Sequence, residues 1–142
     1  MLRRVVLDTS VVVAALRTRL GAGNAVLRLV AVRRLVALAT PPLFLEYEDL
    51  LLRPEQRLAH GLTPEQVEDF LAEFAALIEP VELHFRWRPQ SPDTGDEMVI
   101  EAAVNGRADA VVTYNVKDVL LPCKRFGIPV LTPGEVLKKV KP

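Results

Sequence analysis

Apolar and polar positions divide the chain into short apolar runs and longer amphipathic segments. The short runs predict buried strands over residues 4–7, 35–39, 81–87, 110–113 and 129–131. Helical spacing and helix-start signals predict helices over residues 11–20, 23–32, 41–52, 63–78, 96–105 and 133–139. The clearest helix start is Thr63-Pro64-Glu65-Gln66, which combines an N-cap, a proline in the first turn and a capping box. Gly106 is the predicted C-cap of the helix before it.

Strands and helices alternate along the chain, which predicts an α/β fold made of βαβ units. We expect three α/β/α layers around a central parallel sheet of about four to five strands, with right-handed crossovers. The first strand is short and entirely apolar, so it should lie in the middle of the sheet. A length of 142 residues favours a single domain over residues 1–142.

The first predicted strand ends at a carboxylate, in Asp8-Thr9-Ser10. The carboxyl edge of an open α/β sheet is where ligands bind. Asp8 could ligate a metal there, with the hydroxyls of Thr9 and Ser10 supporting it. The alternative is an ordinary helix N-cap, since all three residue types cap helices.

Two further acidic positions lie at the start of one predicted helix and within another. Asp93-Thr94-Gly95-Asp96-Glu97 opens a predicted helix, and three acids in five residues repel one another unless a cation is near. The helix dipole alone explains one or two of them. Glu46 lies among apolar neighbours in the predicted helix 41–52, where it is either a site residue or a surface residue.

The strand over residues 110–113 is followed by Asn115 and Asp118, with Thr113 as a candidate supporting hydroxyl. Asn and Asp are also common turn residues, so each position by itself is weak. Taken together, converging oxygen ligands at one sheet edge predict a Mg²⁺ or Mn²⁺ site and phosphate chemistry.

Composition and missing motifs limit the classes of protein to which the chain can belong. Eighteen basic and eighteen acidic residues give no net charge, so there is no overall basic excess for nucleic acid, although a zero sum can hide a polarised surface. Cys123 is the single cysteine and excludes an intrachain disulfide. We find no signal-peptide core and no membrane-spanning run, and expect a cytoplasmic protein without a membrane partner. A dinucleotide fingerprint and a Gly-x-Ser-x-Gly nucleophile motif are both missing.

Five stretches stand out in order along the chain: Val5-Val6-Leu7-Asp8-Thr9-Ser10, Leu45-Glu46-Tyr47-Glu48-Asp49-Leu50-Leu51, Asp93-Thr94-Gly95-Asp96-Glu97-Met98, Val112-Thr113-Tyr114-Asn115-Val116-Lys117-Asp118 and Phe126-Gly127-Ile128-Pro129-Val130-Leu131-Thr132-Pro133. Together they resemble the PIN-domain nucleases, in particular the VapC-like branch of toxin components. The resemblance covers nearly the whole chain.

The resemblance implies a role for each candidate. Asp8 is then a first metal ligand, Glu46 the second acidic position and Asp96 the third, around one or two Mg²⁺ or Mn²⁺ ions. Asn115 matches a fourth position that is Asp in many relatives. Asp118 supplies the missing charge, and the remaining supporting residues are Asp93, Thr9, Ser10 and Thr113.

The implied activity is metal-dependent hydrolysis of single-stranded RNA by the toxin of a toxin–antitoxin pair, with a cognate antitoxin and a homodimer as partners. Seven basic residues could track the RNA backbone, and the alternative for each is an ordinary solvated charge: Arg17, Arg19, Arg53, Arg57, Lys117, Lys124 and Arg125. Alternatives are a housekeeping RNA-processing or DNA-repair nuclease and a PIN-like module that binds without cutting. A phosphatase-like domain with Asp8 as nucleophile is disfavoured, since no second Asp follows two residues later.

Overall fold

A computed structural model describes residues 1–84 and 93–140 of the chain. Five strands and eight helices form within these residues. In chain order they are β1 (Arg4–Leu7), α1 (Thr9–Arg17), α2 (Ala22–Ala31), β2 (Val36–Ala39), α3 (Pro41–Leu52), α4 (Pro54–His60), α5 (Pro64–Leu77), β3 (Ile78–Pro80), α6 (Thr94–Gly106), β4 (Ala110–Val112), α7 (Val116–Arg125), β5 (Val130–Leu131) and α8 (Pro133–Lys139).

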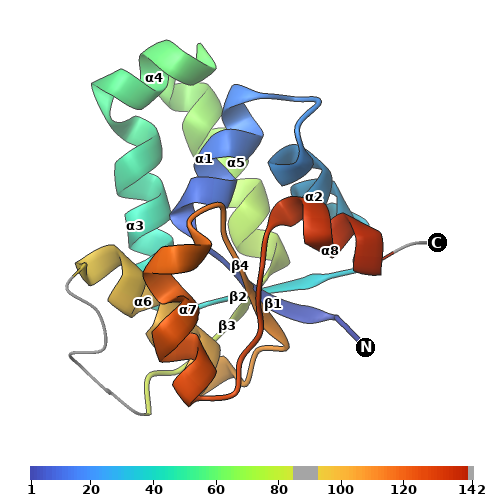
Figure 1. Ribbon diagram of the computed structural model, residues 1–142. Helices are drawn as coiled ribbons and strands as arrows, with labels where there is room; N and C mark the ends of the chain where they lie inside the picture. The colour runs from blue at the N-terminus through green and yellow to red at the C-terminus, as the bar shows by residue number, and fades with distance from the viewer. Residues whose placement is uncertain (85–92, 141–142) are drawn as a thin grey trace.

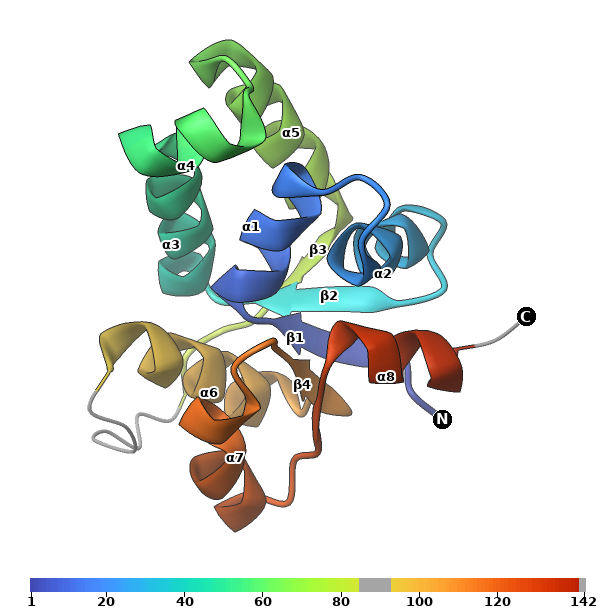
Figure 2. The same cartoon turned by 45° about the horizontal axis from the view of Figure 1, so that its top comes forward.

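The strands form one parallel sheet in the order β3-β2-β1-β4-β5, with β1 in the centre (Figure 1). Helices α1 and α2 cover one face, and α6 and α7 cover the other (Figure 2). The predicted three-layer α/β/α fold and the central position of the first strand are thus confirmed. The physical reason is that Val5, Val6 and Leu7 are completely or almost completely buried, which requires a layer on each face of β1.

The predicted strand over residues 81–87 is wrong in its position. The chain leaves α5 at Leu77 and enters β3 at once, so that Ile78 pairs with Ala37 and Pro80 with Ala39. Residues 81–84 lie outside any strand, and residues 85–87 lie outside the described part of the chain. A proline is tolerated here because β3 is an edge strand, where one backbone donor is not needed for pairing.

Helix boundaries also differ from those expected. Helices α4 and α7 are additional to the predicted ones; Pro54 was interpreted as the end of the preceding helix, and no element was predicted over residues 116–125. Pro54 instead occupies the first turn of α4, where its missing N–H is harmless. Gly106 is the last residue of α6, and Arg107, with φ at 51°, is the C-cap.

Gly106 has a packing role in place of the predicted capping role. A Cβ at this position would lie 3.0 Å from Cγ2 of Val81 and 3.1 Å from Cδ1 of Leu38. Glycine therefore allows the end of α6 to approach β2 closely. This contact helps to hold α6 against the sheet, and α6 is the helix that carries Asp96.

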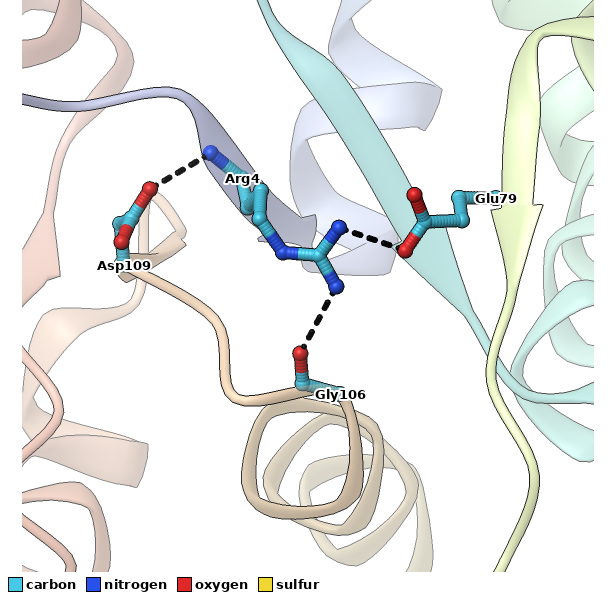
Figure 3. Close-up of polar contacts among 4 residues, drawn as sticks. All are labelled: Arg4, Glu79, Gly106 and Asp109. Carbon is cyan, nitrogen blue, oxygen red and sulfur yellow. Dashed lines mark hydrogen bonds and ion pairs between the residues drawn. The ribbon is translucent and has the colours of Figure 1, made fainter.

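Polar contacts tie the amino edge of the sheet together around Arg4 (Figure 3). The guanidinium of Arg4 lies 2.6 Å from Oε2 of Glu79 in β3 and donates to the carbonyl of Gly106 at 3.0 Å. The backbone N–H groups of Arg3 and Arg4 both donate to Oδ2 of Asp109. These contacts connect β1 with β3, α6 and the start of β4, at the edge opposite the candidate site.

The helices within residues 1–84 and 93–140 include none that is both long enough and apolar enough to span a membrane.

Candidate active site at the carboxyl edge of the sheet

Strands β1 and β4 end side by side, which brings Asp8 and Thr113 together. The N–H of Asp8 donates to the carbonyl of Val112 at 2.9 Å, so the ladder between the two strands continues one residue past β1. The chain then enters α1 directly after Asp8 and reaches α7 directly after Asn115. Parallel pairing thus places two loops, far apart in sequence, at one edge (Figure 2).

Asp8 is the centre of this edge. Its side chain is buried, with 6% exposed, and Oδ2 accepts three hydrogen bonds. The donors are the hydroxyl of Ser10 at 2.6 Å, the hydroxyl of Thr113 at 2.8 Å and the N–H of Ser10 at 3.4 Å. Asp8 is therefore the N-cap of α1, as one reading of the sequence predicted, and it also anchors β4.

Both hydroxyls have a second partner. Ser10 Oγ accepts from the N–H of Tyr114 at 3.2 Å, and Thr113 Oγ1 accepts from the N–H of Asn115 at 2.9 Å. Each hydroxyl has one proton, and donation to Asp8 uses it. The two hydroxyls lie 3.4 Å apart, but neither has a proton left for the other. Asp8 thereby holds the backbone of residues 114 and 115 through two hydroxyl bridges.

The other carboxylate oxygen of Asp8 is the atom that could take a cation. All three hydrogen bonds go to Oδ2, and no donor within residues 1–84 and 93–140 binds Oδ1. A hard divalent ion binds carboxylate oxygens, and Mg²⁺ commonly uses one or two carboxylates, several waters and a substrate phosphate. In its donor chemistry Asp8 fits such an ion.

The other predicted acids do not form a complete set of metal ligands together with Asp8 in the described part of the chain. Within the described part of the chain, no group of three or more His, Cys, Asp or Glu side chains lies close enough to hold a metal ion. Glu46 is half-buried on α3, and Asp96 is half-buried in the first turn of α6. Helices α3 and α6 do pack against each other, so both acids belong to neighbouring elements.

Asp93 and Asp118 have local structural roles. Asp93 is exposed and is the N-cap of α6, where its Oδ1 accepts from the N–H of Asp96 at 3.1 Å. Asp118 is exposed in the first turn of α7, a favourable place for a carboxylate beside a helix N-terminus. Asn115 is the N-cap residue of α7, yet its side chain makes no capping hydrogen bond.

Two predicted supporting residues behave differently from each other. Thr113 donates a hydrogen bond to Asp8, whereas Thr9 makes no hydrogen bond to Asp8 in the structure described.

Among the basic residues proposed to track RNA, Arg53 forms an ion pair with Asp49 at 2.7 Å. That hydrogen bond, followed by the charge of Asp49, raises the pKa of Arg53. The other candidates have exposed side chains: Arg17, Arg19, Arg57, Lys117, Lys124 and Arg125.

Sequence reasoning missed Tyr47. Its side chain is buried on α3 and its hydroxyl donates to the carbonyl of Leu7, the residue before Asp8. Burial, and to a lesser extent the negative charge of Asp8, raises the pKa of Tyr47 well above its usual range. Tyr47 therefore acts as a neutral donor that holds the end of β1. An aromatic residue beside a candidate acid, in Glu46-Tyr47, was the signal available in the sequence.

Two buried acids on α6 were not among the predicted site residues, although Glu97 belongs to the acid-rich stretch that opens this helix. Glu97 and Glu101 are one helical turn apart and are 4% and 3% exposed, among buried Val99 and Ile100. Carboxylates this buried are rare in proteins. Their spacing of four residues on the apolar face of the predicted helix could have identified them.

Comparisons with known proteins agree with this architecture. A model of the PIN domain matches residues 4–117, which include Asp8, Glu46, Asp96 and Asn115. No curated protein sequence matches the chain. Among solved structures, the chain is similar to one from the crystal structure of VapBC2 from Rickettsia felis bound to a DNA fragment from their promoter. The TM-score is 0.61 at 15% identity, over 91% of this chain and 98% of that one. With most of its length matched by the family model, this chain belongs to the PIN domain family.

Proposed function

We propose that the chain is a divalent-metal-dependent ribonuclease that hydrolyses phosphodiester bonds of single-stranded RNA as the toxin of a toxin–antitoxin pair. Membership of the PIN domain family supports a nuclease. The observation that carries the metal site is the asymmetry of Asp8: a buried carboxylate at the sheet edge with three hydrogen bonds on one oxygen. The hydroxyls hold Oδ2, and Oδ1 would be the atom that takes the ion.

The chemistry that Mg²⁺ or Mn²⁺ supplies when bound is a lowered pKa for a coordinated water and neutralised charge on a phosphate oxygen. Asp8 would hold the ion, with Asp96 and Glu46 contributing directly or through water. Ser10 and Thr113 would keep the Asp8 carboxylate in one orientation, because both donate to it and both are fixed by backbone N–H groups. Asn115 and Asp118 lie at the start of α7, where they would orient waters.

The partners are proposed on the same basis. The similar solved structure is named as a VapBC2 complex, which supports an antitoxin as the partner of this chain. A homodimer and a cytoplasmic location complete the proposal. A housekeeping RNA-processing or DNA-repair nuclease would use the same residues. A gene for a small antitoxin next to the gene for this chain would distinguish the toxin from the housekeeping enzyme.

One observation favours a second candidate. The described acids do not form a three-carboxylate group, which is compatible with a module that binds RNA or protein without cutting. Metal binding distinguishes the two functions, because a non-catalytic module does not need an ion at Asp8.

The test combines cleavage with metal binding. A labelled single-stranded RNA pool is incubated with wild type in Mg²⁺, Mn²⁺ or EDTA, and Mn²⁺ binding is measured separately by calorimetry. Asp8→Asn and Asp96→Asn are compared with Asp69→Asn, which removes an exposed carboxylate from α5. We expect the first two variants to lose cleavage and to bind Mn²⁺ at least about tenfold more weakly. Asp69→Asn should behave as wild type.

Equal Mn²⁺ binding in all four proteins would refute the site assignment. Metal binding that depends on Asp8, without cleavage of any RNA, would favour the non-catalytic module.

A further inference from the structure

Tyr114 lies between Thr113 and Asn115 at the candidate site, yet it is exposed to solvent. Thr113 before it binds Asp8, and Asn115 after it begins α7. The N–H of Tyr114 donates to Ser10, so its backbone is part of the same network. Its side chain is nevertheless 45% exposed, whereas Tyr47 on α3 is 2% exposed.

The far end of the same side chain is anchored. The hydroxyl of Tyr114 accepts from the N–H of Gly23 at 3.0 Å, in the first turn of α2. The N-cap of α2 is Gly21, which has no side chain to cap the helix, so Tyr114 satisfies a donor that would otherwise need water. The approach is close, since a Cβ on Gly23 would lie 3.2 Å from this hydroxyl.

Tyr114 is therefore held at its backbone and at its hydroxyl, and it is partly exposed beside the candidate active site. A side chain fixed in this way loses little conformational entropy when a flat ligand covers it. Aromatic rings of this kind stack on unpaired nucleobases, whatever their sequence. A base within a duplex does not offer its face, because its neighbours already cover it. Lys117, exposed in the first turn of α7, adds a positive charge for the nucleic acid backbone.

We propose that Tyr114 is a stacking platform for one unpaired base next to the phosphate that reaches Asp8. This rests on the proposed ribonuclease function and deepens it, because the platform selects single-stranded over duplex RNA. Tyr114 is a positioning residue: it contacts the substrate base and takes no part in bond breaking.

The experiment compares two variants that both lose the hydroxyl. Tyr114→Phe keeps the ring and Tyr114→Leu removes it, so the loss of the cap on α2 is common to both. Binding of a fluorescent single-stranded RNA is measured by anisotropy in EDTA, which suppresses cleavage, after thermal unfolding has shown that both variants fold. We expect Tyr114→Phe to bind within about twofold of wild type and Tyr114→Leu to bind about 5- to 100-fold more weakly, as one lost base–aromatic stack implies.

A second arm locates the base. A single abasic position is moved along the RNA, and one position should weaken binding by wild type and Tyr114→Phe while leaving Tyr114→Leu unchanged. Equal weakening of both variants would mean that only the cap matters and would overturn the platform. So would wild-type affinity in Tyr114→Leu, or a wild type that binds no RNA.

The outcome is separable from that of the nuclease proposal. Binding that depends on the ring, in a protein that cleaves nothing with Mg²⁺ or Mn²⁺, supports the platform and contradicts the ribonuclease. Cleavage by wild type with equal affinities for Phe and Leu at position 114 supports the ribonuclease and contradicts the platform.

Discussion

The hydroxyl of Thr113 lies 2.8 Å from Oδ2 of Asp8, although 105 residues separate them in sequence. This side-chain contact joins the ends of β1 and β4 in addition to the backbone bond from Asp8 to Val112, and the same hydroxyl accepts the N–H of Asn115. Thr113, like Ser10, thus connects the Asp8 carboxylate on one loop to the backbone of the next.

Thr113→Val tests this link, because valine keeps the shape of threonine and removes only the hydroxyl's hydrogen bonds. We expect a loss of about 1–3 kcal/mol in the free energy of unfolding, since a bond to a buried carboxylate is broken and the N–H of Asn115 loses its acceptor. Urea denaturation of wild type and variant measures this difference in the free energy of unfolding. Thr9→Val is the matched control, and it should lie within about 0.5 kcal/mol of wild type because Thr9 does not bind Asp8. Equal losses in both variants would contradict the assigned role.

Tyr47→Phe is expected to lower the free energy of unfolding by about 1–2 kcal/mol, because the buried carbonyl of Leu7 loses its donor. Tyr114→Phe removes a hydroxyl from an exposed side chain, where water replaces it, and should cost less. Urea denaturation of the two variants side by side gives the comparison. A larger loss for Tyr114→Phe would show that the cap of α2 matters more than the end of β1.

Asp109 links stability to pH at the opposite edge of the sheet. The backbone hydrogen bond from Arg4 is the main cause that lowers the pKa of Asp109 below its usual 3.8, and the bond from Arg3 adds to it. A carboxyl group with a lowered folded pKa contributes stability above its unfolded pKa and loses it as the pH falls through the folded value. The loss therefore belongs to the range below about pH 4.

Asp109→Asn should flatten this acid dependence. Thermal unfolding midpoints measured between about pH 6 and pH 2.5 should fall less in the variant than in wild type, because one proton-linked contribution is gone. Identical pH profiles would mean that Asp109 has the same affinity for protons in the folded and unfolded states.

Cys123 should be inert in the folded protein. It is fully buried on α7, and burial raises the pKa of its thiol to about 11. At pH 8 only on the order of one thiol in a thousand is then ionised, and the thiolate is the reactive form. We expect slow alkylation by iodoacetamide in native buffer and rapid alkylation in urea, followed by mass spectrometry. Equally rapid labelling under both conditions would show that α7 opens readily.

The sequence by itself determined the order of most elements and which edge of the sheet holds the polar residues. Short apolar runs identified β1, β2, β4 and β5 to within one residue at each end, and Asp8 and Asn115 were placed at the ends of β1 and β4. These inferences succeed because strand burial and helix starts depend on neighbours along the chain. At Pro54 the prediction failed, because the sequence pattern does not reveal whether a proline ends one helix or occupies the first turn of the next.

Only the tertiary structure decided which side chains share the edge. The position of β3 follows from its pairing with β2, and no local pattern encodes that register. The bonds from Thr113 to Asp8, Tyr47 to Leu7 and Gly23 to Tyr114 join residues that are 105, 40 and 91 positions apart. Each bond forms because the packed sheet and helices bring a donor within reach of an acceptor. The pattern of hydropathy along the chain does not determine this distance between donor and acceptor.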